Sequence, residues 1–312
     1  MRRVISILLI LILVLLTLAK PSEAAAAPSI TAKAAALFDL ASGEVLAGIN
    51  ADTKVYPAST TKVLTALLVA EHGNLTDMVT ISDRAEQQEG TALYCRAGEQ
   101  YSVLDLLNAL LVLSANDVAV ALAEHIAGSV EEFAQMMNEK ARELGTENSN
   151  FLNPNGLPHE DHYTTAADMA KIFTAAFKQP LLRDIMSTRV YYIDLPSGER
   201  RALVNGNKML TEYAGTLGGK TGYTSQAGNC LVTAAQVGDL KLGVAVFKAQ
   251  GQAVWQDAGA LLDYGFANWC NISCTRRAQA VTAMPARYAS EKVLLLAGED
   301  VQLVRAKGDG QL

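Results

Sequence analysis

The stretch Pro57-Ala58-Ser59-Thr60-Thr61-Lys62 opens the segment of this 312-residue chain that decides its fold. Apolar residues recur at helical spacing through Thr60–His72, and Gly73-Asn74 ends the pattern, which predicts a helix. Because Ser59 and Lys62 are three positions apart, they are expected to share one face of that helix. A serine hydroxyl is a poor nucleophile at neutral pH and needs a nearby base. A desolvated lysine close to a second cation can lose its proton and act as that base.

The second motif is Ser114-Ala115-Asn116, which interrupts a helical pattern over residues 103–127. Ser and Asn favour turns and helix starts, so the pattern predicts two helices with the motif at their junction. Ser114 is a candidate relay that bridges Lys62 to the leaving group. Asn116 is a candidate donor to the substrate carbonyl and to Lys62.

The third motif is Lys220-Thr221-Gly222-Tyr223-Thr224, in a stretch predicted to be a strand. Lys220 is a candidate cation for a substrate carboxylate, and Thr221 or Thr224 can donate a hydroxyl to the same group. Gly222 would let a substrate backbone lie close to the strand.

Taken together, the three motifs predict a serine acyl-transferring enzyme that works without histidine. Lys220 is the expected second cation beside Lys62. The backbone N–H groups of Ser59 and Tyr223 are the expected oxyanion hole, since donors aimed at developing charge give the largest catalytic effect.

The remaining pattern predicts an α+β fold. Residues 34–50 are expected to form a hairpin, residues 60–180 to be mostly helical, and Val254–Trp269 to form a closing helix. Further strands are expected at Tyr191–Leu195, Arg201–Val204, Lys220–Thr224, Asn229–Val237 and Lys241–Lys248. We expect the first hairpin and the late strands to share one sheet, with the helical residues inserted between them.

The two ends differ from the middle. Arg2 and Arg3 precede an apolar run, and small residues follow at Ala24–Ala27, so residues 1–27 are predicted to be a secretory signal peptide cleaved near Ala25–Ala27. The alternative is an uncleaved N-terminal anchor, and both place the protein outside the cytoplasm. Residues 28–274 are the expected enzymatic domain. Residues 275–312 are expected to be a short remnant of a β-domain, with strands at Val293–Leu296 and Val301–Val304.

Composition limits the partners. Half of the residues are hydrophobic and the formal net charge is −6, which indicates a globular protein. No long Lys/Arg run is present, so nucleic acid is not an expected partner.

Neither a cofactor nor a metal is expected. The four cysteines have no zinc-site spacing; Cys230 is expected to be buried in a strand, and Cys270 and Cys274 to share a helical face or bracket a turn. His159 and His162, with the acidic residues between them, form either a metal cluster or, as we favour, a solvated loop.

The motifs and their order resemble the serine-type D-alanyl-D-alanine carboxypeptidases, the low-molecular-mass penicillin-binding proteins, from about residue 30 to residue 270. The strings that carry the resemblance are Pro57–Lys62, Ser114–Asp117, Asn153–Leu157, Lys220–Thr224 and Leu261–Phe266. The resemblance implies a β-lactamase/transpeptidase-like fold (an α/β sandwich), in which helices flank an antiparallel sheet and a helical subdomain borders the site. It also implies removal of the terminal D-alanine from peptidoglycan pentapeptides through an acyl-enzyme on Ser59, and covalent acylation by β-lactams.

The chain departs from that family in two places. Members often carry an arginine just before the last long helix, and Gln250–Trp255 contains none, so carboxylate binding would rest on Lys220, Thr221 and Thr224. The family usually has a C-terminal β-domain and an amphipathic membrane anchor; only the short remnant is expected here, which leaves membrane attachment open.

Two other functions compete with the carboxypeptidase. A β-lactamase needs a carboxylate that activates water, which class A enzymes place in a Glu-x-x-x-Asn element. Residues 117–219 lack it, because Phe151 follows Glu147 and Thr164 follows Glu160 at that spacing. A non-catalytic peptidoglycan-binding protein is disfavoured by the intact pair of serine and lysine in the first motif.

Overall fold

The computed structural model describes residues 28–285, 292–298 and 300–308. The expected signal peptide, including its cleavage region, lies outside the described residues. The chain divides into two compact units, Pro28–Gly265 and a C-terminal unit that begins at Phe266. This boundary falls ahead of the one expected at residue 274.

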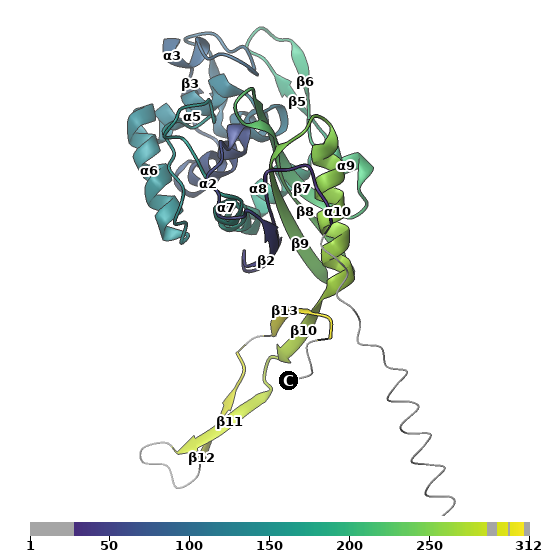
Figure 1. Cartoon of the computed structure of the whole chain (residues 1–312). Helices are drawn as coiled ribbons and strands as arrows, with labels where there is room; N and C mark the ends of the chain where they lie inside the picture. The colour runs from purple at the N-terminus through teal and green to yellow at the C-terminus, as the bar shows by residue number, and fades with distance from the viewer. Residues whose placement is uncertain (1–27, 286–291, 299, 309–312) are drawn as a thin grey trace, which may run out of the picture. The chain divides into compact units, whose positions relative to one another are not determined.

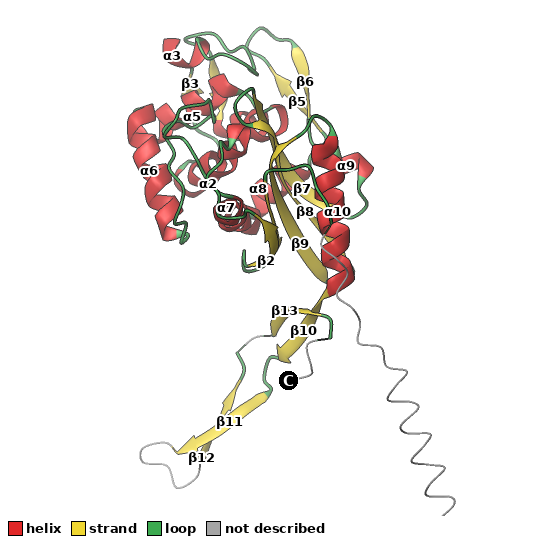
Figure 2. Ribbon diagram, in the orientation of Figure 1, coloured by secondary structure: helices red, strands yellow, loops and turns green. Residues whose placement is uncertain are grey.

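The first unit is built around one five-stranded antiparallel sheet, with the strand order β2-β1-β9-β8-β7 (Figures 1 and 2). Its strands are β1 (Ala34–Asp39), β2 (Val45–Ile49), β7 (Thr216–Thr224), β8 (Gly228–Val237) and β9 (Leu240–Ala249). Strand β1 pairs with β9 from Ala34↔Phe247 to Asp39↔Leu242. The prediction that the first hairpin joins late strands is therefore confirmed, and it leaves β7 at one edge of the sheet.

Helices cover both faces of this sheet (Figure 2). Because side chains alternate along a strand, Phe38 and Leu37 of β1 point to opposite faces. Phe38 packs edge-on against Phe173 of α7 (Ala166–Lys178), with the ring centroids 6.2 Å apart. Leu37 lies toward α10 (Ala253–Asn268), where the absence of a Cβ at Gly265 lets the helix approach: a Cβ there would lie 2.9 Å from Leu37 Cδ1.

The helical region follows β2, as predicted. Its α and π helices are α2 (Lys62–His72), α3 (Asp83–Glu86), α4 (Val103–Asn108), η2 (a π-helix, Ala109–Leu113), α5 (Asn116–Ala127), α6 (Val130–Glu143), α7 and α8 (Pro180–Ser187). A 3-10 turn, η1 (Ala58–Thr61), leads into α2, and α9 (Met209–Glu212) follows later. The first eight residues of α2, 62–69, are all buried, which places the residue that begins this helix inside the hydrophobic core.

In the first unit, two short antiparallel strand pairs lie outside the main sheet. Strand β3 (Met78–Thr80) pairs with β4 (Gln100–Ser102), and β5 (Val190–Asp194) pairs with β6 (Arg200–Val204). The expectation that all late strands share one sheet is therefore wrong for β5 and β6. Polar contacts hold this hairpin to the helical region instead: Tyr191 donates to Asp105 Oδ1 at 2.6 Å, and Arg201 Nη1 donates to Leu93 O at 2.6 Å.

In the C-terminal unit, the described residues form two antiparallel strand pairs. Strand β10 (Trp269–Thr275) pairs with β13 (Val301–Ala306), and β11 (Ala280–Pro285) pairs with β12 (Lys292–Leu296). The strands predicted at 293–296 and 301–304 are confirmed, whereas β10 and β11 were not predicted. Cys270 and Cys274 lie on β10 as free thiols, so the expectation of a helical face or a turn is wrong. Cys230 is buried in β8, as predicted.

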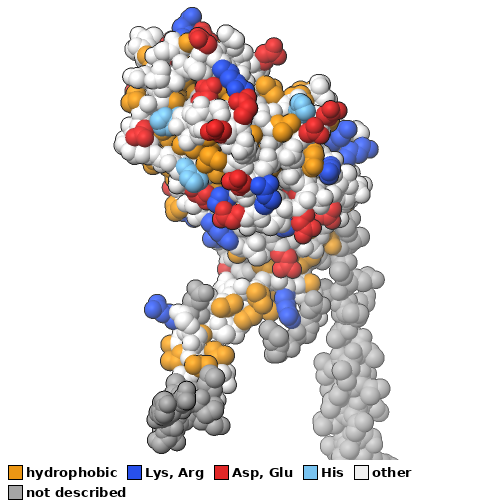
Figure 3. Space-filling model, turned by 90° about the vertical axis from the view of Figure 1, so that its left-hand side faces the viewer, with side chains coloured by type: hydrophobic (Ala, Val, Ile, Leu, Met, Phe, Trp, Pro, Cys, Tyr) orange, Lys and Arg blue, Asp and Glu red, His pale blue; other side chains and the backbone are white. Residues whose placement is uncertain are grey.

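On the face shown in Figure 3, acidic and basic side chains are interspersed, without a continuous basic band. Across the described residues, no helix combines the length and the apolar composition that crossing a membrane requires.

Candidate active site

Ser59 and Lys62 lie where η1 passes into α2. Lys62 Nζ lies 2.9 Å from Ser59 Oγ, so the predicted pairing of hydroxyl and amine is confirmed in space. Lys62 has 0% of its surface exposed, whereas Ser59 is partly exposed. The amine is therefore shielded from water, while the hydroxyl remains within reach of a substrate.

Two further oxygen atoms hold the Lys62 amine in place. Lys62 Nζ donates to Asn116 Oδ1 and to Asn155 O, both at 2.7 Å. Asn116 in turn donates from Nδ2 to Glu89 O at 2.6 Å, which fixes which end of its amide faces the lysine. The expectation that Asn116 donates to Lys62 is wrong: since an ammonium or amine supplies the protons, the amide oxygen accepts.

Asn155 belongs to the turn Asn153–Gly156, which packs against Ala58, the residue before the serine. Asn153 Oδ1 accepts from Gly156 N at 2.7 Å and closes the turn. Gly156 has φ +84, and a Cβ on it would lie 1.9 Å from Ala58 O. Only glycine fits this contact. The sequence indicates the turn but not its role at the site, because the group that binds Lys62 is a main-chain carbonyl.

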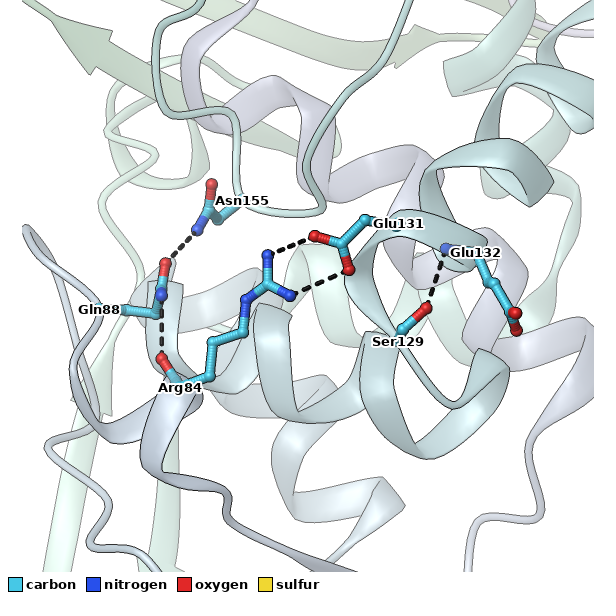
Figure 4. Close-up of polar contacts among 6 residues, drawn as sticks. All are labelled: Arg84, Gln88, Ser129, Glu131, Glu132 and Asn155. Atoms are coloured by element: carbon cyan, nitrogen blue, oxygen red, sulfur yellow. Dashed lines mark hydrogen bonds and ion pairs between the residues drawn. The ribbon is translucent and has the colours of Figure 1, made fainter.

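A chain of polar contacts supports this turn from outside (Figure 4). Asn155 Nδ2 donates to Gln88 Oε1 at 3.0 Å, and Gln88 Nε2 donates to Arg84 O at 2.9 Å. Arg84 forms a two-pronged ion pair with Glu131 of α6, at 2.8 and 3.0 Å. Gln88 was not identified in the sequence, since nothing in the residues around it distinguishes it from the neighbouring Gln87.

Ser114 and Lys220 form the second half of the site. Ser114 follows the π-helix η2 in a left-handed conformation (φ 72, ψ 33), which is uncommon for a residue with a side chain. Its Oγ accepts from Lys220 Nζ at 2.8 Å, and Lys220 Nζ also donates to Thr221 O at 2.8 Å. The expected bridge from Ser114 to Lys62 is not what the structure shows; the partner of Ser114 is Lys220.

Burial lowers the pKa of both lysines. For Lys62 the loss of hydration is the largest cause, the positive charge of Lys220 adds to it, and the negative charge of Asp117 opposes it, so the pKa lies well below the usual value. Burial lowers the pKa of Lys220 to about 7. The prediction of a desolvated lysine beside a second cation is confirmed, and the lowered pKa favours the neutral amine at Lys62 that a base requires.

A cavity of about 370 Å³ opens onto Ser59. Its walls include Ser114, Thr221, Gly222 and Tyr223. A Cβ on Gly222 would lie 2.8 Å from Ser59 N, so glycine lets β7 approach the nucleophile closely.

Two other predicted features lie at the margin of this cavity or outside it. Thr224 is not among its walls; Thr224 Oγ1 accepts from Ala227 N at 3.0 Å in the turn after β7. In the stretch without arginine, Val254 and Trp255 line the cavity, and Lys208 Nζ donates to Gln252 Oε1 at 3.0 Å.

His162 has a structural role next to η1, the 3-10 turn that contains Ser59. It is buried, and its Nδ1 accepts from Leu152 N at 3.1 Å, so Nε2 carries the proton and donates to Thr61 Oγ1 at 3.0 Å. The prediction of a solvated loop is therefore wrong at His162. Within the described part of the chain, no group of three or more His, Cys, Asp or Glu side chains could hold a metal ion.

The burial of His162 predicts a loss of stability in acid. Burial, with a smaller effect of the charge of His159, lowers the pKa of His162 to about 4 from 6.5. Between these two values the unfolded chain binds the proton and the folded chain does not, so the free energy of unfolding falls as pH falls from 6.5 to 4. The contribution is at most about 1.4 kcal/mol per pH unit. Urea unfolding at several pH values should show this slope in the wild type and a shallower one in His162→Asn; parallel slopes would contradict it.

The combination of these features defines a class of enzyme. A serine hydroxyl held by a buried lysine of lowered pKa, at the start of a core helix and beside the edge strand of an antiparallel sheet, is the arrangement of a serine hydrolase that uses lysine as its base.

Comparison with known proteins identifies the family. The sequence profile of the D-alanyl-D-alanine carboxypeptidases (Peptidase_S11) matches residues 21–251, and the chain belongs to this family, as the motifs predicted. The D-alanyl-D-alanine carboxypeptidase DacF of Bacillus subtilis (strain 168) is 33% identical over 288 residues, which cover 89% of this chain and 73% of DacF. DacB2 of Mycobacterium tuberculosis is 34% identical over 254 residues, covering 80% and 87%.

Solved structures agree with the fold. Penicillin binding protein 5 from Haemophilus influenzae superimposes with a TM-score of 0.81 at 32% identity, over 90% of this chain and 84% of that chain. The predicted β-lactamase/transpeptidase-like α+β fold is confirmed. The β-lactamase and non-catalytic alternatives are not favoured.

Gln88 holds Asn155, whose carbonyl oxygen in turn binds the Lys62 amine, and this indirect contact leads to a prediction. Gln88→Leu removes the acceptor for Asn155 Nδ2 and should slow acylation of Ser59 by about three- to tenfold, the effect of one lost, partly buried hydrogen bond. Gln88→Glu keeps an acceptor oxygen and should restore most of the rate. Gln87→Leu, at an exposed neighbour, is the matched control. Stopped-flow labelling with a fluorescent penicillin measures the rates; equal rates in Gln88→Leu and Gln87→Leu would exclude the role of Gln88.

Proposed function

We propose that this protein is a serine-type D-Ala-D-Ala carboxypeptidase, which removes the terminal D-alanine of peptidoglycan stem pentapeptides through an acyl-enzyme on Ser59. One observation carries the proposal: the amine of Lys62, buried and of lowered pKa, lies 2.9 Å from the Ser59 hydroxyl. Membership of the carboxypeptidase family supports the choice of substrate.

The contacts of Lys62 suit a general base. A neutral amine has two N–H groups and one lone pair. The carbonyl oxygens of Asn116 and Asn155 cannot donate, so they take the two N–H groups and the lone pair is left for Ser59 Oγ. Lys62 therefore accepts the serine proton as Oγ bonds to the carbonyl carbon of the penultimate D-alanine.

Acylation then needs an oxyanion site and a proton for the leaving group. We assign the oxyanion to the backbone N–H groups of Ser59 and Tyr223, both of which line the cavity. As the peptide bond breaks, the nitrogen of the terminal D-alanine takes a proton from Ser114 Oγ, which is replenished from Lys220 at 2.8 Å. Lys62 then releases the serine proton to solvent and Lys220 regains one from solvent, so that Lys62 is again a neutral base. Water attacks the ester carbon, Lys62 takes a proton from that water, and it returns this proton to Ser59 Oγ as the ester bond breaks.

The substrate carboxylate is assigned to Lys220 and Thr221. Lys220 is buried with its amine against Thr221 O, and Thr221 lines the cavity. A carboxylate brought next to Lys220 favours its protonated form, which offsets the effect of burial. Thr224, which already accepts from Ala227 N, is a weaker candidate for this contact.

The same chemistry accounts for β-lactams as covalent inhibitors. Ser59 Oγ would open the strained amide and form an ester, and the ring nitrogen would stay tethered to the acyl group. None of the side chains that line the cavity carries a carboxylate, so slow release is expected. We also propose that the protein acts outside the cytoplasm, supported by the signal-like residues 1–27 and by the location of peptidoglycan.

The deciding experiment follows the purified mature protein with a pentapeptide that ends in D-Ala-D-Ala. We expect stoichiometric release of D-alanine, blocked by prior incubation with benzylpenicillin, and a penicilloyl adduct that tandem mass spectrometry assigns to Ser59. Absence of both release and adduct would refute the proposed function. An adduct on Ser59 with rapid turnover of a chromogenic cephalosporin would instead favour a β-lactamase.

A further inference from the structure

The start of α5 holds a segment that forms part of the wall of the catalytic cavity. This segment is residues 89–95, which we call the strap, and its Thr91 lines the cavity. Asn116 N donates to Thr91 O at 2.7 Å, and Asn116 Nδ2 donates to Glu89 O at 2.6 Å. A Cβ on Gly90 would lie 2.9 Å from Asn116 Nδ2, so the strap passes close to this amide. The amide that binds the lysine base therefore depends on the strap for its orientation.

Asp117 binds the same strap through two N–H groups. Its Oδ1 accepts from Leu93 N at 3.0 Å, and its Oδ2 accepts from Cys95 N at 3.1 Å. Val118 N also donates to Oδ1, at 2.9 Å. Only 1% of the surface of Asp117 is exposed, and among the described residues it forms no ion pair within 4.0 Å. Because a buried carboxylate without a cationic partner is costly, these main-chain N–H groups are what stabilise its charge.

Arg201 of the β5–β6 hairpin is a second charged side chain that binds the strap. Its Nη1 donates to Leu93 O at 2.6 Å, and its guanidinium lies 5.7 Å from the ring centre of Tyr94. The backbone of Leu93 is therefore held at both polar groups, its N–H by a carboxylate and its C=O by a guanidinium. Charge-assisted hydrogen bonds are roughly twice as strong as neutral ones, so these two contacts restrain the strap.

Asp117 also acts on the charge of Lys62. The two charged side chains that act on this amine come from other elements, Lys220 from β7 and Asp117 from α5. The positive charge of Lys220 adds to the effect of burial and lowers the pKa of Lys62, whereas the negative charge of Asp117 opposes it. The carboxylate that holds the strap is thus also the negative charge that bears on the base.

The other titratable groups around Asp117 do not replace this charge. Burial raises the pKa of the Cys95 thiol and of the Tyr101 hydroxyl, so both stay neutral. Glu99, which accepts from the Tyr101 hydroxyl at 2.9 Å, is partly exposed, where solvent and salt weaken its effect on a distant amine.

We propose that Asp117 is a positioning residue for the acylation step. Its carboxylate holds the strap, and the strap in turn orients the Asn116 amide that binds the Lys62 amine. Its negative charge also partly offsets the positive charge of Lys220 at that amine. The inference rests on the proposed function and deepens it, because it gives a buried acid outside the three motifs a part in setting the base.

Asp117→Asn tests both parts of the proposal. The amide keeps the size of the side chain, but it carries no charge and its NH₂ cannot accept from a strap N–H, so the maximal rate of acylation should fall by about tenfold. Acylation needs the neutral Lys62 amine, which is lost as pH falls through its pKa. Without the opposing negative charge this pKa falls further, so the acid side of the pH–rate profile should move to lower pH. Stopped-flow labelling with a fluorescent penicillin at a series of pH values measures both effects.

Arg201→Met separates position from charge. It removes the donor to Leu93 O but leaves the charge of Asp117, so the maximal rate should fall by about three- to tenfold while the acid side of the profile stays in place. Arg201 is partly exposed, so this variant also tests the strap if Asp117→Asn does not fold. A wild-type rate in Arg201→Met would overturn the role of the strap.

Asp168→Asn is the matched control. Asp168 is likewise buried in the first turn of a helix, α7, and accepts from Asn148 N at 2.8 Å and from Glu147 N at 3.2 Å. Its loss should lower the Tm, as that of Asp117 does, but should leave the maximal rate and the pH–rate profile as in the wild type.

The outcomes separate this inference from the proposed function. An acid side of the profile that stays in place or moves to higher pH in Asp117→Asn would overturn the inference, and so would a maximal rate equal to that of Asp168→Asn. Both results leave the function standing, since Ser59 is still labelled. Absence of labelling at Ser59 in the wild type would overturn the function itself.

Discussion

Lys62→Arg is expected to lower the rate of Ser59 acylation by about 10³-fold, although it preserves the positive charge. A guanidinium keeps its proton at any pH a protein survives, so it cannot accept the serine proton, and general-base catalysis is typically worth about 10²- to 10⁴-fold. The position also has no room for a larger planar group, since Lys62 is fully buried and its amine contacts three oxygens. Labelling with a fluorescent penicillin, followed over hours, measures the rate.

Two comparisons make the result interpretable. Ser59→Ala sets the background, because it removes the oxygen that is proposed to be acylated. Thermal unfolding of Lys62→Arg distinguishes a lost base from a disrupted core. A folded Lys62→Arg protein that acylates within tenfold of the wild type would exclude Lys62 as the base and point to Lys220 acting through Ser114, its contact at 2.8 Å.

Gly156→Ala is expected to destabilise the protein by about 3 kcal/mol or more, a large effect for one methyl group. Two costs add: a left-handed backbone at φ +84 disfavours a side chain by about 1–2 kcal/mol, and the new Cβ would lie 1.9 Å from Ala58 O, which must move. Since Asn155 O and Ser59 move with these atoms, acylation should also slow. Differential scanning calorimetry should show a Tm lower by about 6–12 °C.

Gly145→Ala is the matched control for this effect. Gly145 has a similar φ of +76, but a Cβ there would meet no atom within 4 Å. It therefore carries the backbone cost without the clash, and its Tm should fall by much less. An equal fall in Tm in the two variants would mean that the close contact between Gly156 and Ala58 adds nothing to the cost of the substitution.

The sequence predicted the parts of the site that side chains define. Ser59, Lys62, Ser114, Asn116 and Lys220 meet because each lies in a motif whose local structure is strongly specified: a helix start, a helix junction and a strand. Hydrophobic periodicity placed these elements correctly, since most residues of α2, α5, α7, β8 and β9 are buried.

The sequence missed what main-chain atoms and tertiary packing define. The carbonyls of Asn155 and Glu89 orient Lys62 and Asn116, yet a carbonyl is common to every residue and leaves no sequence signal. The direction of the Lys62–Asn116 bond and the partner of Ser114 depend on atomic distances that spacing does not supply. The β5–β6 hairpin was assigned to the wrong sheet because strand propensity says nothing about which neighbour a strand finds.

The position of β7 at the end of the sheet order bears on inhibitor design. An extended inhibitor that docks along this border would present its amide nitrogens alternately toward the enzyme and toward solvent. N-methylation of every second amide should thus yield two isomeric series of opposite behaviour: one blocked from docking, the other tolerated and protected from proteolysis. The edge strand β7 could therefore guide the design of peptidomimetic inhibitors of this enzyme that contain no β-lactam ring.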